Sequence, residues 1–496
     1  MGDQDELVQT ELYVGGTMRP AEGDRTYELF NPARPSELVG QAAAASCADV
    51  EEAVQAAHGA FPQWSSLSHS ERAEKLRAVA ASLNADEDDV SRRSRLFTRE
   101  HGKIIHETLL EMSRLGDRFM QAAAYSERLG KDEEIAGPPF DTLVMRQARG
   151  VAALIVPWNW PLSILGAKLP QALIAGNTVV VKPSQSSALA PMQTLQIIAD
   201  ILPPGVVNVL SGSAGEIGDA LVSHPLVRTV NFTGSVDVGR HVMKVAAENI
   251  TPVTLELGGN DPALVLEDAE LSPEAFKRMY FGAFGSSGQI CMAMKRLYVH
   301  ESRYDEVVDG MIAACNKAVV GDGLLPETTM GPVNNAKQLK VVTDMIAEAR
   351  AKATEVRECG QVPDEALYNG GGYFQKPALV LGADPSLSVV RDEQFGPVLP
   401  IMKFKADSDA IAMANDSDFG LCSSVWTQDA DRAVRMARQL EAGYTYLNDH
   451  GPMAQDGRGP FGGFKQSGIG RNLGYDGVLG FTEPHSITGP AGFLLS

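Results

Sequence analysis

The sequence predicts an α/β fold with two successive parallel sheets. From residue 151 onward, short apolar runs of strand length alternate with amphipathic stretches of helix length. Such alternation is typical of βαβ units, in which helices cover both faces of a parallel sheet. A second series of the same kind begins near Asn260, and a chain of 496 residues is too long for one ordinary core, so two or three domains are expected.

The first part of the chain is expected to contain short strands followed by helices. Strands are predicted at residues 11–14 and 26–30, next to Gly and Asn-Pro turn signals. Helices are predicted where apolar residues recur at helical spacing, at residues 48–61, 70–84, 87–100 and 103–129. These helices are interpreted as scaffold, and no chemistry is assigned to them.

The first regular α/β series follows an acidic break at residues 131–140 and an alternating strand at 142–149. Its predicted strands are 151–156, 178–182, 206–210, 228–233 and 253–257. Its predicted helices are 162–175, 190–201, 215–222 and 236–249. Ligands bind such sheets at the carboxyl ends of the strands, which is where functional residues are expected.

The second series ends in a long loop. Its predicted strands are 263–266, 296–300, 378–381, 398–404, 421–426 and 444–447. Its predicted helices are 273–285, 304–320, 407–415 and 430–440. The loop at residues 451–470 is rich in Gly and Pro, and long loops in compact domains are usually functional.

Composition excludes several classes of function. With 63 acidic and 43 basic residues the formal charge is −20, which argues against nucleic acid or an anionic membrane as a partner. No apolar run is long enough for a transmembrane helix, and the acidic N-terminal segment does not match a signal peptide. Five scattered cysteines without CxxC pairs suggest neither a disulfide framework nor a metal site, so a cytoplasmic location is expected.

Cys291 is the strongest candidate for a nucleophile. A free cysteine is usually a small buried hydrophobe. Here the preceding segment, residues 285–288, consists of Gly and Ser, so the backbone can turn tightly and another molecule can approach it. Upstream, an apolar strand delivers Glu256 just before a Gly-Gly turn, and a carboxylate at the end of a buried strand is costly unless it has a function or a partner.

Seven motifs around these residues identify a resemblance to the aldehyde dehydrogenase superfamily. They are VPWNWPL at 156–162, VVVKPS at 179–184, NFTGS at 231–235, LELGG at 255–259, GQIC at 288–291, EQFGPV at 393–398 and PFGGFKQSGIGR at 460–471. The resemblance covers nearly the whole chain. It implies two Rossmann-type domains: a cofactor-binding domain of residues 1–130 and 149–258 and a catalytic domain of residues 259–455. It also implies a bridging β element, residues 131–148 and 476–496, that builds a homo-dimer or homo-tetramer.

The resemblance further implies oxidation of an aldehyde to the carboxylic acid with NAD or NADP. Thiolate addition gives a tetrahedral adduct that can expel a hydride, and the resulting thioester must be hydrolysed, so a nucleophile, an oxyanion site and a base are required. By match to the family motifs, Cys291 is the nucleophile, Glu256 the general base and Asn159 the oxyanion donor. Lys168 matches a lysine that helps to set the proton and water network.

Cofactor contacts are implied mainly at the ends of the predicted strands. The turn at residues 234–239 is not the GxGxxG fingerprint, although it can bring a pyrophosphate to a helix N-terminus. The implied residues are Val156, Pro157, Trp158, Lys182, Ser184, Gln185, Gly215, Phe232, Gly234, Ser235, Val238, Leu257, Gly258, Glu393 and Phe395. Because Gln185 stands where NAD-preferring members commonly carry a glutamate, NADP is expected to be accepted alongside NAD.

The substrate pocket and the acceptor of the acyl group leave alternatives open. The expected pocket residues are Trp160, Ile290, Met292, His450, Met453 and Phe461. Arg458 is either a partner for the carboxylate of a semialdehyde or a solvated loop residue. Aliphatic, aromatic and semialdehyde substrates remain candidates, and the alternatives to hydrolysis are a coenzyme A-acylating enzyme and an inactive scaffold on the same fold. A strand at 481–486 is expected to pair with residues 142–149 across a subunit boundary.

Overall fold

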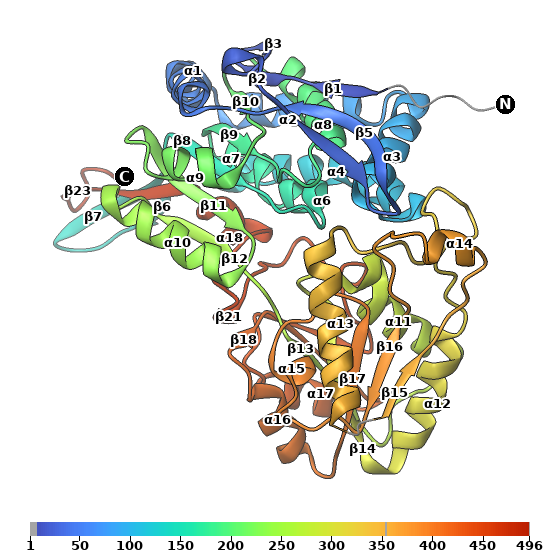
Figure 1. Ribbon diagram of the computed structural model, residues 1–496. Helices are drawn as coiled ribbons and strands as arrows, with labels where there is room; N and C mark the ends of the chain where they lie inside the picture. Colours follow the sequence, from blue (N-terminus) through green and yellow to red (C-terminus); the bar gives the residue numbers. More distant parts are fainter. Residues whose placement is uncertain (1–6, 353–354, 496) are drawn as a thin grey trace.

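The computed structural model describes residues 7–352 and 355–495, which form two α/β lobes and a projecting β arm (Figure 1). Residues 1–6 and 496, which the predicted cofactor-binding and bridging parts include, lie outside the described residues. The predicted α/β class with two sheets is confirmed, although both large sheets are mixed because antiparallel strands are added at their edges.

The sheet of the first lobe is ordered β22-β12-β11-β8-β9-β10-β2-β3. Its strands are β2 Leu12–Val14, β3 Thr17–Arg19, β8 Val151–Ile155, β9 Thr178–Lys182, β10 Val207–Val209, β11 Val227–Thr233, β12 Val253–Glu256 and β22 Gly468–Ile469. The strands from β12 to β10 are parallel. The direction of the connections reverses between β8 and β11, and ligands bind doubly wound sheets at such a switch point.

Helices cover both faces of this sheet (Figure 1). They are α1 Cys47–Ser65, α2 His69–Leu83, α3 Glu87–His101, α4 Ile105–Ala123, α5 Ser126–Leu129, α6 Pro161–Gly166, α7 Leu169–Ile174, α8 Leu189–Ile201, α9 Ala214–Val222, α10 Val236–Ala246 and α18 Gly474–Leu479. Alternate residues of β8 enter opposite cores: Leu154 packs in the cluster of α2, α4 and α8, and Ala153 in the cluster of α1, α9 and α10. Burial on both faces explains why the strands are continuously apolar.

The sheet of the second lobe is ordered β15-β16-β17-β14-β13-β19-β20, with only β15 antiparallel. Its strands are β13 Asp261–Val265, β14 Met294–His300, β15 Glu355–Glu358, β16 Ala378–Leu381, β17 Val398–Phe404, β19 Cys422–Trp426 and β20 Tyr444–Leu447. Its helices are α11 Pro273–Phe284, α12 Tyr304–Cys315, α13 Ala336–Ala351, α14 Glu365–Tyr368, α15 Ser388–Arg391, α16 Asp407–Asn415 and α17 Ala430–Ala437. Short 3-10 turns lie at Glu22–Asp24, Ala247–Asn249, Gly285–Gly288 and Glu301–Arg303.

Three small sheets complete the part of the fold that the structure describes. The first joins β1 Val8–Thr10, β4 Thr26–Asn31 and β5 Arg34–Ala43; the second joins β18 Phe419–Gly420 to β21 Phe464–Lys465. The arm consists of β6 Glu133–Ile135, β7 Phe140–Ala148 and β23 Thr482–Pro490. Among the described residues, no helix combines the length and the apolar character that crossing a membrane requires.

The pairing predicted for the C-terminal strand was wrong. Within one chain, β23 pairs with β7 from Thr482 opposite Ala148 to Pro490 opposite Phe140. The reason lies at the root of the arm, where the side chain of Asn177 accepts a hydrogen bond from Gly150 N and donates one to the carbonyl of Phe481. Both strands therefore leave the first lobe at neighbouring points, and pairing across a subunit boundary is not needed to satisfy β23.

Two helices differ from the predicted ones in ways that bear on the site. The predicted helix 162–175 is divided into α6 and α7, because Pro170 has no N–H to continue the first helix and starts the second instead. Lys168 lies in the break, with φ of −128° and ψ of −57°. The predicted helix 103–129 is also divided, into α4 and α5. Helix α13, which begins after the N-cap Asn335, was not predicted.

Candidate active site

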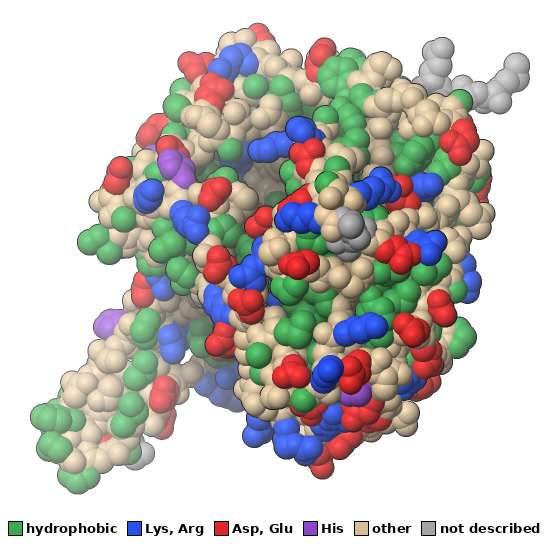
Figure 2. Space-filling view, turned by 60° about the horizontal axis from the view of Figure 1, so that its bottom comes forward, with side chains coloured by type: hydrophobic (Ala, Val, Ile, Leu, Met, Phe, Trp, Pro, Cys, Tyr) green, Lys and Arg blue, Asp and Glu red, His purple; other side chains and the backbone are tan. Residues whose placement is uncertain are grey.

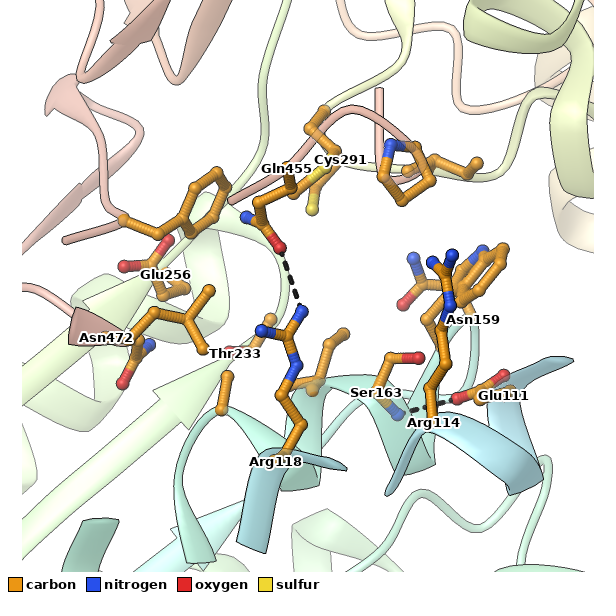
Figure 3. A pocket seen from close by; sticks show the side chains of 18 of the residues that line it. Glu111, Arg114, Arg118, Asn159, Ser163, Thr233, Glu256, Cys291, Gln455 and Asn472 are labelled. Atoms are coloured by element: carbon orange, nitrogen blue, oxygen red, sulfur yellow. Dashed lines mark hydrogen bonds between the residues drawn. The ribbon is translucent and has the colours of Figure 1, made fainter. Parts of the chain in front are cut away.

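A cavity lies where α4, α6, the ends of three parallel strands and the 285–296 segment meet (Figure 3). Its polar lining residues are Glu111, Arg114, Arg118, Asn159, Ser163, Thr233, Glu256, Cys291, Gln455 and Asn472. Its apolar lining residues are Leu110, Leu115, Trp160, Ile164, Ala167, Ile290, Met292, Pro452, Phe461 and Leu473. The predicted nucleophile, base and oxyanion donor thus face one cavity.

The backbone before Cys291 is held in a strained turn. Ser286, Ser287 and Gly288 have φ values of 51°, 55° and 73°, in the left-handed region that non-glycine residues rarely occupy. A Cβ atom at position 288 would clash with the backbone of Gly396. The turn is fixed by hydrogen bonds from Ser286 N to Glu107 Oε1 at 2.7 Å and from Ser287 Oγ to the carbonyl of Gly331 at 2.8 Å. This turn presents Cys291 to the cavity, where it is partly exposed.

Asn159 connects the end of β8 to the nucleophile segment. Its Nδ2 donates a hydrogen bond of 2.9 Å to the carbonyl of Gln289. The side chain is buried, and an amide NH₂ group carries two hydrogens, of which this bond uses one. The other hydrogen can serve an acceptor that enters the cavity beside Cys291.

Glu256 ends β12 as a buried carboxyl group without a hydrogen-bond partner on either oxygen among the described residues. Only 5% of the surface of Glu256 is exposed. Burial raises the pKa of this carboxyl to about 8, and the charges of Lys168 and Arg471 oppose that rise. A group with this pKa can both accept and release a proton near neutral pH, as a general base requires.

The thiol of Cys291 is not a ready thiolate. Burial raises its pKa to about 12; the charge of Lys295 opposes the rise, while the charges of Glu393, Glu256 and Asp261 add to it. Lys295, at the start of β14, donates hydrogen bonds to the carbonyls of Ile290 at 2.6 Å and Cys291 at 3.0 Å. The thiol therefore has to lose its proton to a base when it reacts.

Lys168 reaches the cavity only through other side chains. Its Nζ donates to Asn231 Oδ1, and Asn231 Nδ2 donates to Asn472 Oδ1 at 2.8 Å. Asn472 lines the cavity, whereas Lys168 does not. Burial lowers the pKa of Lys168 to about 8, and the charges of Glu256 and Cys291 oppose this change. The break between α6 and α7 places this lysine against Asn231 of β11.

The predicted cofactor residues gather at the carboxyl ends of the parallel strands. Val156, Pro157 and Trp158 follow β8, Ser184 and Gln185 come shortly after β9, and Leu257 and Gly258 follow β12. Phe232 lies in β11, Gly215 lies in the first turn of α9, and Ser235 is the N-cap of α10, accepting from Val238 N. Glu393 and Phe395 come from the second lobe: Glu393 Oε1 accepts from Gly259 N at 3.0 Å, and the Phe395 ring meets Trp158 edge-on at 5.5 Å.

Two features of this region suit a phosphorylated or hydroxylated ligand. The buried ammonium of Lys182 has only the carbonyl of Pro183, at 3.5 Å, as a hydrogen-bond partner among the described residues. Burial lowers its pKa to about 8. A Cβ at Gly234 would clash with the ring of Phe232, so a side chain is excluded at the residue before the N-cap of α10. A buried cation without an anionic partner and a helix N-terminus can each bind an anionic or polar group.

Comparison with known proteins agrees with this geometry. Residues 18–487 match the sequence profile of the aldehyde dehydrogenase family. The chain belongs to this family. It is 35% identical over 487 residues to the glutarate-semialdehyde dehydrogenase of Pseudomonas aeruginosa, covering 96% of this chain and 97% of the relative. It is 34% identical over 488 residues to the chloroplastic betaine aldehyde dehydrogenase of Amaranthus hypochondriacus, covering 96% and 95%.

Solved structures of the family have the same fold. The betaine aldehyde dehydrogenase of Staphylococcus aureus in complex with NAD+ superposes with a TM-score of 0.90 at 30% identity, covering 98% of this chain and 95% of that one. The NAD-dependent aldehyde dehydrogenase of Sinorhizobium meliloti gives a TM-score of 0.91 at 29% identity, covering 99% and 96%. The chain is therefore an oxidoreductase of the aldehyde dehydrogenase class.

The pocket of this aldehyde dehydrogenase contains part of the predicted set. Trp160, Ile290, Met292 and Phe461 line the cavity. His450 and Met453 are not among the lining residues: His450 is fully buried with Nδ1 2.9 Å from Ser424 Oγ, and Met453 is exposed. Leu447 and Asn448 before it are exposed, whereas the ring of His450 is held inside by Ser424 and by packing against the ring of Tyr446.

Sequence reasoning assigned no role to α4, yet this helix supplies five lining residues of the aldehyde dehydrogenase cavity: Leu110, Glu111, Arg114, Leu115 and Arg118. Their spacing puts them on one side of the helix. Two arginines one turn apart repel each other, which is unfavourable on a surface helix. This unfavourable pair was the feature of the sequence that could have indicated a function for α4. Arg458, the arginine that the sequence suggested, is exposed and paired with Asp456 at 2.6 Å.

Proposed function

We propose that this aldehyde dehydrogenase oxidises an aldehyde to the carboxylic acid, with hydrolysis of a thioester on Cys291 and with NAD or NADP as the oxidant. The observation that carries the proposal is the common cavity of a partly exposed thiol, Cys291, and a buried carboxyl group without a hydrogen-bond partner among the described residues, Glu256. A buried carboxyl group in this state is costly unless it is used in chemistry.

In the first half-reaction the sulfur of Cys291 adds to the carbonyl carbon of the aldehyde. The thiol proton passes to the carboxylate of Glu256, directly or through one water molecule. The oxyanion that forms accepts hydrogen bonds from the Asn159 amide and from the backbone N–H of Cys291. One donor of this kind is worth about 10² to 10³ in rate.

The cofactor supplies the acceptor for the hydride that leaves the tetrahedral adduct. Lys182 and the N-terminus of α10 would hold its adenosine half, and Glu393 and Phe395 would hold its nicotinamide half. The ammonium of Lys182, which has no anionic partner among the described residues, and the helix N-terminus that follows Gly234 support this assignment. The bound NAD+ of the Staphylococcus aureus relative supports NAD, and the absence of a carboxylate at Gln185 supports acceptance of NADP.

Before the second half-reaction Glu256 releases the thiol proton to the solvent, and it then takes a proton from water as the water attacks the thioester carbon. The thiolate of Cys291 then leaves, and the carboxylic acid is released. The chain of hydrogen bonds from Lys168 through Asn231 to Asn472 keeps a positive charge near this step. Its charge favours the ionised form of Glu256 and therefore its action as a base.

We also propose the domain assignment that follows from this reaction. The first sheet with its helices binds the cofactor, and the second lobe carries the nucleophile. Residues 456–475, which the sequence assignment left between domains, include β22, which pairs antiparallel with β12 beside Glu256. After the second lobe the chain therefore returns to the first sheet, next to Glu256.

The two other functions make different demands. A coenzyme A-acylating enzyme transfers the acyl group to a thiol and does not need Glu256 as a water-activating base. An inactive scaffold needs neither Cys291 nor Glu256. Two relatives are named glutarate-semialdehyde dehydrogenases, so a semialdehyde is a candidate substrate within the leading proposal.

An absorbance assay of cofactor reduction over a panel of aldehydes tests the proposal. The assay is run with NAD and with NADP, each with and without coenzyme A. We expect reduction without coenzyme A and a carboxylic acid as the product. An absolute requirement for coenzyme A would replace the proposal by the acylating reaction, and no reduction with any aldehyde would favour the scaffold.

We propose that the arm mediates assembly into a homo-dimer or homo-tetramer. It exposes large hydrophobic side chains, among them Ile135 at 51%, Phe140 at 59% and Ile487 at 40% (Figure 2). Such groups on a thin three-stranded sheet are a liability unless a second copy covers them. The mass in solution of Phe140→Asp should fall relative to the wild type, whereas Ile250→Asp, at a residue 88% exposed outside the arm, should leave it unchanged.

A further inference from the structure

Two arginines of α4 extend toward the cavity that contains Cys291. Arg114 and Arg118 stand one helical turn apart, and both line the cavity (Figure 3). Arg114 is exposed and Arg118 is half-buried, so the pair runs inward from the surface. The reaction proposed above uses neither residue.

The fold provides a fitted seat for the side chain of Arg118. A Cβ atom at Gly166 would lie 2.9 Å from Cγ of Arg118, and a Cβ at Gly457 would clash with its guanidinium. The guanidinium donates to Oε1 of Gln121 at 3.1 Å and of Gln455 at 3.5 Å. Two positions without side chains and two neutral acceptors therefore hold this cation at the cavity wall.

Neither arginine has a carboxylate partner within 4 Å among the ion pairs of the described residues. Two acidic groups nearby, Glu111 and Asp456, are engaged elsewhere. Glu111 accepts from Lys103 Nζ at 2.5 Å and from Leu162 N at 2.8 Å, and Asp456 pairs with Arg458. Burial, and then the charge of Arg114, lower the pKa of Arg118, while the charges of Asp117 and Asp456 act in the opposite direction.

We propose that Arg118, assisted by Arg114, binds the carboxylate at the far end of an aliphatic aldehyde substrate. This inference rests on the function proposed above and names its substrate class. The guanidinium fork matches the two oxygens of a carboxylate, and an anion relieves the repulsion between the two arginines. The apolar part of the cavity lining, which includes Leu115, Ile164 and Phe461, suits a chain of methylene groups.

Matched substrates and variants test this assignment. Initial rates are measured with the four-, five- and six-carbon aldehydes that end in a carboxylate and with their methyl esters, which have the same chain, one additional methyl group and no charge. For the preferred length we expect kcat/KM of the wild type to favour the carboxylate by about 10- to 100-fold. Arg118→Met should lower kcat/KM for the carboxylate, through KM, far more than kcat/KM for the ester, so that most of this preference is lost. Arg114→Met should have a smaller effect in the same direction.

Arg458→Met is the matched control, because Arg458 is a nearby loop arginine that does not line the cavity. It should keep the preference of the wild type. Gly457→Ala is a second test that leaves both arginines in place: its methyl group displaces the guanidinium of Arg118, so the preference should fall. The dicarboxylate product should inhibit oxidation of the ester by the wild type, and Arg118→Met should weaken that inhibition about 10-fold or more.

Three results would overturn the assignment. These are equal kcat/KM values for carboxylate and ester in the wild type, equal losses for both in Arg118→Met, and a stronger preference for an aldehyde that ends in a phosphate. Oxidation of the methyl esters separates this inference from the proposed function. If the esters are oxidised without any preference for the carboxylate, only the role of the arginines fails; if no aldehyde is oxidised, the proposed function fails.

Discussion

The side-chain amide of Asn159 donates a hydrogen bond of 2.9 Å to the backbone carbonyl of Gln289. This bond joins the turn after β8 to the segment that carries Cys291. Helix α4 braces both partners, because Glu111 accepts from the backbone N–H groups of Leu162 and Ser163, and Glu107 accepts from that of Ser286. The oxyanion donor and the nucleophile are therefore held in register by buried hydrogen bonds before any substrate arrives.

Replacement of Asn159 by Ala should reduce kcat by about 10² to 10³, because one donor to the oxyanion is lost. Cofactor binding, measured by fluorescence titration, should stay close to that of the wild type. The same variant also loses the bond to Gln289, so thermal unfolding should be measured in parallel. A variant that is stably folded and retains full kcat would show that Asn159 does not stabilise the oxyanion.

Cys291→Ala should abolish oxidation, because the covalent intermediate can no longer form. Cofactor binding should persist, since the predicted cofactor residues belong to other segments. Cys47→Ala is the matched control, because Cys47 is an exposed free cysteine at the start of α1, distant from Cys291 in the sequence. Oxidation by Cys291→Ala above a few per cent of the wild-type rate would contradict the assignment of the nucleophile.

Glu256→Gln should separate the two half-reactions, because the amide has nearly the same shape but cannot accept a proton from water. We expect at most one equivalent of reduced cofactor per site, formed more slowly than in the wild type because the thiol also loses its proton to Glu256, followed by very slow turnover. An unchanged steady-state rate would mean that another group is the base for hydrolysis.

The pH dependence of the wild type gives an independent check of Glu256. Its carboxyl has a pKa raised to about 8, so it is largely protonated below that pH and becomes an active base only as the pH rises. Turnover limited by hydrolysis should therefore increase through about pH 8 and then level off. Loss of this rising limb in Glu256→Gln assigns it to the carboxyl, whereas the same limb in both proteins would assign it elsewhere.

The parallel strands could be predicted from the sequence because burial on both faces leaves a simple apolar run, as in β9 and β11. The residues at their carboxyl ends followed from the motifs. The break at Lys168 was also visible, since Pro170 lies inside the predicted helix, but a continuous apolar pattern outweighed it. Helix α13 has apolar residues at helical spacing and an Asn cap, so this helix could have been predicted from the sequence.

The role of α4 could not be predicted in the same way. Arg118 enters the cavity only because Gly166 and Gly457, which are distant in sequence, leave room for it. Likewise the sequence indicates only that Lys295 belongs to a strand. The fold shows that its ammonium donates hydrogen bonds to the carbonyls of Ile290 and Cys291. Such roles depend on contacts between segments that no local pattern records.

The choice between NAD and NADP should depend on Gln185. This residue is exposed after β9, three positions beyond the buried ammonium of Lys182, which has no carboxylate partner among the ion pairs of the described residues. A phosphate on the adenosine ribose would meet a cation and no opposing charge. We therefore expect the wild type to use both cofactors. Gln185→Glu should shift the ratio of kcat/KM values toward NAD by about 10- to 100-fold, mostly by weakening NADP.

Gln185→Ala separates charge from shape in this test. It removes the amide without adding a negative charge, so the ratio should stay close to that of the wild type. Because salt screens the repulsion between the introduced carboxylate and the phosphate at an exposed position, the shift in Gln185→Glu should also shrink at high ionic strength. A shift of equal size in both variants would point to shape instead of charge, and a wild type without NADP activity would mean that other residues exclude the phosphate.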